Sequence, residues 1–594
     1  MKPTNTSEPQ YFHKVVDCQY ACPAHTPVPE YIRLIAEGKY TEAYIINLES
    51  NVFPGVLGRT CDRPCEPACR RGRVEKEPVA ICRLKRVAAD NKDDNEVLQR
   101  LPKIPSEKNG KRIAVIGAGP ASLTVARDLM PLGYTIDLYD EHSKAGGFMR
   151  SQIPSFRLPE SVLDQEVGYI LNSGVVTTFN TYVDSLKAIL TQNYDAVFVG
   201  TGAPQGKDLK SLPGRNDTNN NIHIGIQWLA NVAFEHTQSI GKRVIVLGGG
   251  NTAMDCCRTA RRLGGQNVTV VVRSPRTEMK ASSWEIADAE MEDIPIIDNH
   301  VPQSFIVKNG KLTGMAFEKV KALYNEKGQR YLEPTGEALV VIECDDVIIA
   351  IGQENAFPWI EKDIGMAFDE WGNPIVDRQT FQSSLEKVFF GGDAAFGPKN
   401  VITAVAHGHQ AAISIDLFCH GKNIQNQRPA PETNLFAQKM GVHEWIYAND
   451  VTNDLRHHVP HRDKSKTLND RFLEVEIGFN EDDGYKEAQR CLNCDIQTIF
   501  NEKKCIECDA CTDVCPTDCI TFIENDEESE LRKKLNAPAN HLEQDLYVSN
   551  NLKTKRVLVK DENVCLHCGL CAERCPTAAW DMQKYLYKEA KAGC

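Results

Sequence analysis

The sequence is most informative at residues 111–141, KRIAVIGAGPASLTVARDLMPLGYTIDLYDE, which have the order strand, glycine-rich turn, helix and strand. Gly117 permits the tight turn, and Gly119 lets the backbone approach a pyrophosphate at the N-terminus of the helix. Asp140 or Glu141 ends the second strand, where an acidic side chain binds a ribose hydroxyl. We therefore predict a dinucleotide-binding unit with the contact residues Gly117, Gly119, Pro120, Ala121, Ser122, Asp140, Glu141 and Gly147.

The same order of elements returns at residues 242–273, KRVIVLGGGNTAMDCCRTARRLGGQNVTVVVR. Arg273 and Arg276 stand where an NAD-binding unit carries an acidic residue, and arginines there favour the 2′-phosphate of NADPH over NADH. The alternative is that both arginines are solvated loop residues. The predicted contact residues of this unit are Gly248, Gly250, Asn251, Thr252, Ala253, Arg273 and Arg276.

Two further strands end in glycine, at GTGA (200–203) and at GGD (391–393). Because the second unit is nested inside the first, we expect FAD in the first unit and the nicotinamide cofactor in the second. Asp393 would then contact the ribityl chain of the flavin, or else it caps the next helix. Arg157, in IPSFRLP, contacts either a cofactor or the surface. The additional predicted contact residues are Gly202, Gly392 and Asp393.

The chain has 22 cysteines, and they gather in closely spaced runs near its two ends. In a long chain without a signal peptide, such runs favour metal or cluster ligation over disulfides. The motif C-x2-C-x2-C-x3-C-P occurs twice near the C-terminus and is typical of two-cluster bacterial ferredoxins, in which the fourth cysteine of each run binds the other cluster. Two zinc sites are the competing interpretation. One predicted ligand set is Cys505, Cys508, Cys511 and Cys575, and the other is Cys565, Cys568, Cys571 and Cys515.

The remaining candidate ligands are scattered rather than arranged in one run. They are Cys18, Cys22, Cys61, Cys65, Cys69 and Cys82, with Cys491 and Cys494 far away in the sequence. Eight cysteines would serve two more [4Fe–4S] clusters, which makes four in the chain. The alternative is a structural zinc ion.

Length and composition narrow the class of protein. A chain of 594 residues is expected to contain about three to five domains. The net charge of −13 disfavours nucleic acid and anionic membranes as partners. The N-terminus has no apolar signal region, and no long apolar run occurs, so we expect no membrane span and a cytoplasmic location.

The predicted class is α/β, with two nested Rossmann-like domains between an α-helical iron–sulfur domain and an α+β bacterial ferredoxin-like domain. The expected parts are a helical domain at 1–108, an FAD domain at 109–235 and 353–430, a nicotinamide domain at 236–352, a linker at 431–499 and a ferredoxin domain at 500–594.

The motifs CPAHTPVPEYI, GRTCDRPCEPACRRG, PVAICRLKR, GAGPAS, IPSFRLP, GGGNTAMD, RTEMKA and GGDAAFGP resemble the glutamate synthase small-subunit family. That family includes the flavin half of dihydropyrimidine dehydrogenase and the large subunit of NADH-dependent ferredoxin:NADP oxidoreductase. The resemblance implies a helical domain with two [4Fe–4S] clusters, followed by an FAD domain interrupted by an NADPH domain. It covers residues 1 to about 500. Ser274 departs from the arginine pair of the family.

The family usually places a C-x-x-C ahead of the position of Cys18, and nothing suitable stands there in this chain. The residues typical of that missing motif occur instead in EAQRCLNC, which ends at Cys494. The resemblance therefore implies one cluster on Cys18, Cys69, Cys491 and Cys494 and another on Cys22, Cys61, Cys65 and Cys82. Lys85 occupies the position of a Gln or Glu ligand in relatives, which leaves Cys82, three residues earlier, as the better ligand.

Together these features predict an NAD(P)H:ferredoxin-type oxidoreductase, an electron-transfer subunit with FAD and four [4Fe–4S] clusters. It would exchange electrons with a low-potential partner such as ferredoxin or a 2-oxoacid:ferredoxin oxidoreductase. A glutamate synthase small subunit, a flavin-based bifurcating subunit and a non-catalytic electron-transfer adaptor are the alternatives. We name no acid–base residue, because the cofactors carry the chemistry.

Overall fold

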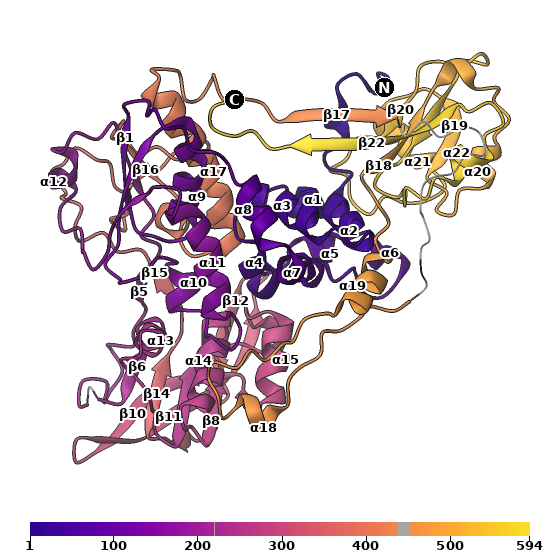
Figure 1. Cartoon of the computed structure of the whole chain (residues 1–594). Helices are drawn as coiled ribbons and strands as arrows, with labels where there is room; N and C mark the ends of the chain where they lie inside the picture. The colour runs from indigo at the N-terminus through magenta and orange to yellow at the C-terminus, as the bar shows by residue number, and fades with distance from the viewer. Residues whose placement is uncertain (219, 438–451, 453) are drawn as a thin grey trace.

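The computed structural model describes residues 1–218, 220–437, 452 and 454–594. Helices dominate its first hundred residues and lie between the two nucleotide domains and the C-terminal module (Figure 1). Cys22, Cys61 and Cys69 are the extended residues directly after α1, α4 and α5, so three candidate ligands lie at helix ends. The helices are η1 (Pro9–Phe12), α1 (Asp17–Ala21), α2 (Val28–Ala36), α3 (Tyr40–Asn51), α4 (Pro54–Thr60), α5 (Cys65–Ala68), α6 (Arg71–Val74), α7 (Ile81–Asn91) and α8 (Asp94–Arg100).

The first nucleotide domain is built on a five-stranded parallel sheet in the order β16-β4-β1-β2-β3. The chain leaves this sheet after β4 and returns only at β16, because the second domain is inserted between them. Its strands are β1 (Arg112–Ile116), β2 (Thr135–Tyr139), β3 (Val176–Thr178), β4 (Ala196–Val199) and β16 (Val388–Phe390). Its helices are α9 (Pro120–Leu129), η2 (Met130–Leu132), α10 (Phe148–Ser151), α11 (Glu160–Leu171), α12 (Leu186–Leu190), α16 (Asp393–Phe396) and α17 (Val401–Cys419).

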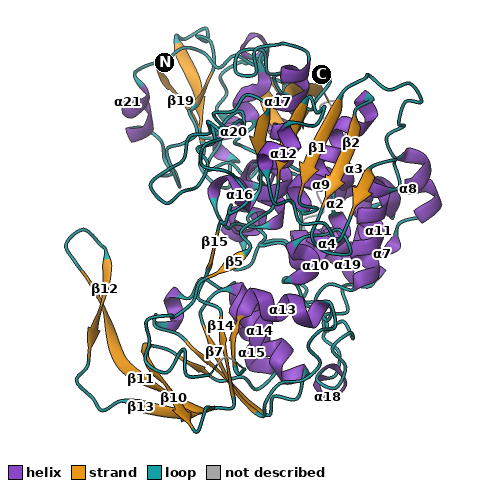
Figure 2. Cartoon of the chain, turned by 90° about the vertical axis from the view of Figure 1, so that its left-hand side faces the viewer, coloured by secondary structure: helices purple, strands orange, loops and turns teal. Residues whose placement is uncertain are grey.

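The second nucleotide domain has its own five-stranded parallel sheet, in the order β6-β14-β7-β8-β9. An antiparallel ribbon, β10 to β13, projects from this domain (Figure 2). The sheet strands are β6 (Ile222–Ile224), β7 (Arg243–Leu247), β8 (Asn267–Val271), β9 (Ile296–Ile297) and β14 (Asp346–Ile349). The helices are α13 (Gly225–Ala233), α14 (Asn251–Arg262), η3 (Arg276–Glu278) and α15 (Ser283–Met291), and the ribbon strands are β10 (His300–Lys308), β11 (Lys311–Tyr324), β12 (Arg330–Pro334) and β13 (Val340–Glu343).

The chain crosses between the two domains at β5 (Gln205–Gly206) and β15 (Gln353–Glu354), which pair antiparallel. The second domain begins earlier than the expected boundary at 235, because β6 and α13 precede that residue and belong to the second sheet. The short edge strand β6 carries no glycine fingerprint, so the sequence pattern did not separate it from the first domain.

Of the two helices that precede the cysteine runs of the final module, α18 (Lys464–Thr467) lies beside the second nucleotide domain, where Lys464 pairs with Asp293, and α19 (Glu481–Ala488) packs against α2 and α7. One antiparallel sheet has the order β17-β22-β18 and the other β19-β21-β20. The strand β17, expected in a linker, therefore belongs to a sheet of this module. The strands are β17 (Glu432–Ala437), β18 (Ile496–Phe500), β19 (Ile520–Glu524), β20 (Tyr547–Val548), β21 (Arg556–Lys560) and β22 (Trp580–Lys588), with helices η4 (Glu502–Lys504), α20 (Ala510–Asp513), α21 (Glu528–Lys533) and α22 (Leu570–Arg574).

These elements confirm the predicted fold class, in which two nested parallel α/β domains stand between a helical domain and a small module of antiparallel sheets. Among the described residues, no helix is both long enough and apolar enough to cross a membrane.

Candidate functional site

One cavity, of about 1600 Å³, is lined by residues of both nucleotide domains. Ser122, Ala253 and Arg276 are the predicted contact residues that do not line it. The predicted contact residues that do line it are Gly117, Gly119, Pro120, Ala121, Asp140, Glu141, Gly147, Gly202, Gly248, Gly250, Asn251, Thr252, Arg273, Gly392 and Asp393. The structure thus brings both glycine motifs to one space.

The first glycine turn packs so closely against the segment at Gly200 that its glycine cannot carry a side chain. Gly117 has φ +89°, and a Cβ there would lie 2.7 Å from the carbonyl oxygen of Gly200. Ser122, which replaces the usual third glycine, packs its hydroxyl against Gly200, where a Cβ would come within 2.1 Å of Ser122 Oγ. These close approaches match the needs of a pyrophosphate at the start of α9.

The two acidic residues after β2 have different environments. Asp140 is buried and accepts hydrogen bonds from the backbone N–H groups of Ala118, at 2.6 Å, and His142, at 2.8 Å. Its carboxylate therefore holds the turn in shape. Glu141 is exposed at the cavity and makes no such bond among the described residues, which favours Glu141 as the ribose ligand.

The second glycine turn is equally tight, because Gly248 has φ +140° and a Cβ there would lie 2.1 Å from the carbonyl oxygen of Ala350. Three cationic side chains line the cavity beyond it: Arg273, Lys280 and Arg330. Arg276 instead forms an ion pair with Glu290. Lys280 and Arg330 were not predicted, since nothing in the sequence places them beside a strand end of the sheet.

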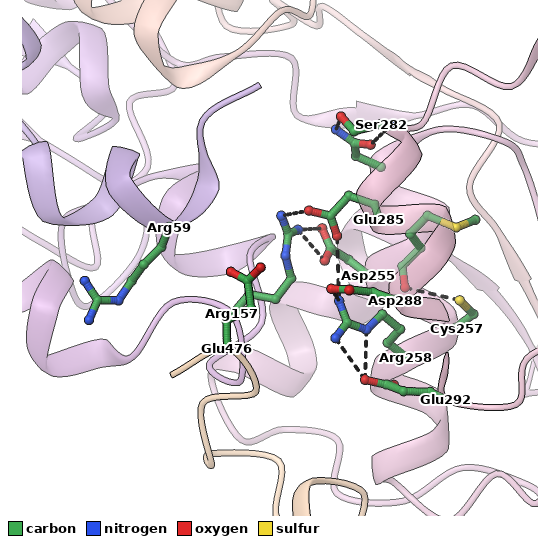
Figure 3. Close-up of polar contacts among 12 residues, drawn as sticks. Arg59, Arg157, Asp255, Cys257, Arg258, Ser282, Glu285, Asp288, Glu292 and Glu476 are labelled. Carbon is green, nitrogen blue, oxygen red and sulfur yellow. Dashed lines mark hydrogen bonds and ion pairs between the residues drawn. The ribbon is translucent and has the colours of Figure 1, made fainter. Parts of the chain in front are cut away.

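Arg157 belongs to a buried ion network between the two nucleotide domains (Figure 3). Its Nη1 donates to both carboxylate oxygens of Asp255, at 2.6 and 2.9 Å, and its Nη2 donates to Glu285. Arg258 extends the network to Asp288 and Glu292. Burial raises the pKa of Asp255 to about 6, although the Arg157 guanidinium opposes this shift. Arg157 is therefore an interdomain contact, although it also lines the cavity.

Four cysteines from the two ends of the chain lie close together beside α1 and α5. Burial raises the pKa of the Cys18 thiol, and the neighbouring thiols of Cys69, Cys494 and Cys491 raise it further. Cys491 and Cys494 form a C-x-x-C that follows shortly after α19, and α19 packs against α2 and α7. The structure thus places side by side the four cysteines of the predicted split set.

A second group surrounds the start of α7. Hydrogen bonds with Cys82 and burial raise the pKa of the thiols of Cys61 and Cys65. Lys85 lies one turn further along α7 and is buried. Burial by itself would lower the pKa of Lys85, but the nearby sulfurs of Cys82, Cys61, Cys22 and Cys65 raise it overall. Its Nζ donates to Asn51 Oδ1 at 2.9 Å, so this lysine is held by an amide.

The final module holds the two remaining groups. The Cys505 thiol has Cys575 and Cys508 as neighbours, and Cys511 has Cys505 and Cys575. The thiols of Cys565 and Cys515 neighbour Cys568, and those of Cys565 and Cys568 neighbour Cys571. Cys519, which is outside the predicted ligand sets, also lies here, with its Sγ 3.5 Å from that of Cys515.

Arg70 connects the split cysteine group with the final module. It is fully buried, and its Nη1 donates to the carbonyl oxygen of Glu562 at 2.7 Å and to that of Cys565. The same atom lies 2.8 Å from His567 Nε2, while Nε forms an ion pair with Asp17. Arg70 follows the candidate ligand Cys69 directly in the sequence, and its guanidinium contacts the backbone of the candidate ligand Cys565.

All 22 cysteines are free thiols in the structure, and most of the sixteen candidate ligands are buried. A buried group of four thiols suits an iron–sulfur cluster or zinc, because both bind deprotonated sulfur. The residues present therefore fit the predicted clusters, as the glycine turns fit two dinucleotides.

Three family models match successive parts of the chain. Residues 111–408 match the family model for pyridine nucleotide-disulphide oxidoreductases. Residues 12–97 match dihydropyrimidine dehydrogenase domain II, 4Fe-4S cluster, and residues 504–579 match the 4Fe-4S dicluster domain.

Three curated relatives are similar over most of their length. The chain is 34% identical to the NADP(+)-dependent formate dehydrogenase subunit beta of Moorella thermoacetica, over 80% of this chain and 70% of the relative. It is 30% identical to the NADPH-Fe(3+) oxidoreductase subunit beta of Geobacter sulfurreducens, over 83% and 77%. It is 31% identical to the glutamate synthase [NADPH] small chain of Azospirillum brasilense, over 68% and 86%.

The resemblance to the glutamate synthase small subunit is confirmed by these matches. The chain belongs to the pyridine nucleotide-disulphide oxidoreductase family and is an NAD(P)H-dependent FAD and iron–sulfur oxidoreductase with 4Fe–4S domains at both ends.

Proposed function

We propose that this chain is the NADPH-oxidising, electron-transfer subunit of a larger redox enzyme, and that it exchanges electrons with a low-potential partner. Ferredoxin or a 2-oxoacid:ferredoxin oxidoreductase core fits that description. One observation carries the proposal: the cavity that joins both glycine turns also reaches Thr60 and Asp62, which flank the candidate ligand Cys61. A nucleotide site and a cysteine group therefore share one wall.

The residues of the cavity divide between two cofactors. The turn at Gly117, with Glu141 and Asp393, would hold FAD, and the turn at Gly248 would hold the nicotinamide cofactor. Burial raises the pKa of Asp393 to about 6, with the backbone N–H of Lys399 opposing the shift. When bound, FAD would accept a hydride from the nicotinamide and release its electrons singly.

The cations beyond β8 support a preference for NADPH. A 2′-phosphate carries about two negative charges and accepts charge-assisted hydrogen bonds. Arg273 and Lys280 lie in the wall of the cavity, and Arg330 comes from the projecting ribbon, where it also pairs with Glu278 at 2.6 Å. These side chains would bind the 2′-phosphate, which NADH lacks.

The relatives named above support the role as a subunit, because two of them are described as beta subunits. The ferredoxin-like module favours an iron–sulfur partner over the glutamate synthase role, for which the resemblance implies no such module. A flavin-based bifurcating subunit remains the alternative that needs the same cofactors.

The proposal is tested on anaerobically purified protein. NADPH should bleach the flavin faster than an equal concentration of NADH, and about sixteen irons should be present per chain, four per cysteine group. The clusters should then be reduced by NADPH through the flavin. Preference for NADH, or about half that iron content, would contradict the proposal.

A further inference from the structure

The candidate cysteine ligands differ in how far they are exposed to solvent. Of the sixteen candidate ligands, all of which the structure describes, Cys508 alone is exposed. It lies just before α20, and the side chain of Ile506 beside it is 56% exposed. A buried redox group can exchange electrons with another protein only where that protein can approach it closely. The exposed surface at Ile506 and Cys508, called the opening below, allows such an approach.

This opening lies at the end of the molecule opposite the nucleotide cavity. The cysteine group at the start of α7, which includes Cys61, adjoins the cavity through Thr60 and Asp62. Arg70 links the split group of Cys18, Cys69, Cys491 and Cys494 to the final module. Figure 1 shows α20 at the outer edge of that module, with the N-terminal helices between it and the nucleotide domains. The group that contains Cys508 is therefore the last of the series.

Exposed lysines border the opening. Lys503 and Lys504 end η4, just before the segment that holds Cys508, and Lys553 and Lys555 come from the loop before β21. The two segments are joined because Thr554 N donates to Glu507 Oε1 at 3.1 Å. All four lysines are exposed, and none of them takes part in an ion pair among the described residues.

Acidic groups lie in the same segments, and two of them share one arginine. Arg556 pairs with Glu507 and with Asp509, both at 3.4 Å. Glu502 accepts a hydrogen bond from Asn550 at 3.1 Å, and Asp513 is exposed. Residues 502–513 and 553–556 together hold five Lys and Arg residues and four Asp and Glu residues, a net charge of +1, whereas the chain as a whole carries a net charge of −13.

We propose that this lysine border, residues 503, 504, 553 and 555, is the docking surface for an electron-transfer protein that presents an acidic face. The inference rests on the proposed function, because it assigns the exit point of that electron path. Complementary charge steers such partners together and fixes their orientation, at a rate that falls with salt. An acidic carrier would be held with its redox centre over Ile506 and Cys508.

The test measures binding to an acidic bacterial 2[4Fe–4S] ferredoxin, with a basic c-type cytochrome as the opposite probe. Two variants reverse the charge of the border, Lys503→Glu with Lys504→Glu, and Lys553→Glu with Lys555→Glu. A matched control reverses two exposed lysines at the tip of the projecting ribbon, Lys308→Glu with Lys311→Glu. Each variant changes the net charge by the same amount, so only the place of the change differs.

Wild type should bind the ferredoxin more weakly as salt rises, and each border variant should weaken binding about tenfold or more at low salt. The ribbon variant should bind like wild type, and the border variants should gain affinity for the cytochrome. Iron content and flavin bleaching by NADPH, measured on the same samples, report on the proposed function separately. Equal losses in the ribbon and border variants, or no binding of ferredoxin by wild type, would overturn the docking surface even if both of those readouts are normal.

Discussion

Arg157 Nη1 donates to both carboxylate oxygens of Asp255, at 2.6 and 2.9 Å, and so joins the two nucleotide domains through a buried ion pair. Glu285, on α15, accepts from the same guanidinium (Figure 3). Phe156, the residue before the arginine, packs under Arg262 of α14, whose guanidinium carbon lies 3.8 Å from the ring centroid. The IPSFRLP motif of the first domain is therefore a contact that orients the second.

Removing Arg157 should destabilise this interface strongly. In Arg157→Met, two buried carboxylates lose a shared cation, which we expect to lower the free energy of unfolding by about 3–5 kcal/mol. Urea unfolding measures this change. As a control, Arg100→Met removes an exposed pair with Glu96 and should cost about 0–1 kcal/mol. A loss for Arg157→Met as small as that of the control would show that the network does not hold the domains together.

The preference for NADPH should depend on Arg273 and Lys280 and not on Arg276. Each charge-assisted phosphate contact contributes about 1.5–3 kcal/mol, so Arg273→Ala with Lys280→Ala should raise the KM for NADPH about tenfold or more. The KM for NADH should change little. Arg276→Ala is the matched control, because its guanidinium pairs with Glu290 outside the cavity lining. If Arg276→Ala alone abolishes the preference, the assignment of the phosphate site is wrong.

Local spacing explains why much of this molecule could be predicted from its sequence. The turns at Gly117 and Gly248 each follow a buried strand and open a helix, and the geometry of a βαβ unit places each of them at the carboxyl edge of its own sheet. The paired runs ending at Cys515 and Cys575 have a spacing that fixes which sulfurs can meet. In each case the residues that act together are close in the sequence or repeat a known interval.

Contacts between distant segments left no such signal. Arg157 and Asp255 are 98 residues apart, and Arg70 and His567 are 497 apart. An arginine in a loop has the same local pattern whether it binds a phosphate, pairs with a buried carboxylate or lies in solvent. Only the folded arrangement distinguishes these cases, so the sequence alone does not decide the role of Arg157 and does not single out Arg70.

The contact between His461 and the second nucleotide domain should weaken as pH rises. Its Nε2 lies 3.5 Å from Asp288 Oδ1, and a hydrogen bond with Asp288 raises the pKa of His461 above its usual value. Because the folded-state pKa is the higher one, the contribution is fully present below about pH 6.5 and is lost as pH rises through the raised pKa. Thermal unfolding across this range should show a smaller fall in stability for His461→Gln than for wild type. His458→Gln, which removes an exposed pair with Glu77, should keep the wild-type profile.

The last prediction is that one cluster is held by both ends of the chain. Cys491 and Cys494 follow α19, and their thiols neighbour Cys69 and Cys18. Cys491→Ala with Cys494→Ala should therefore remove about four irons per chain and one cluster signal in electron paramagnetic resonance. The flavin and the two clusters of the final module should remain, because their predicted ligands are unchanged. Cys256→Ala with Cys257→Ala alters two buried cysteines on α14 outside all four groups and should remove no iron. Loss of a final-module signal, or an unchanged iron content, would instead assign the pair to another role and leave Cys18 and Cys69 without a complete ligand set.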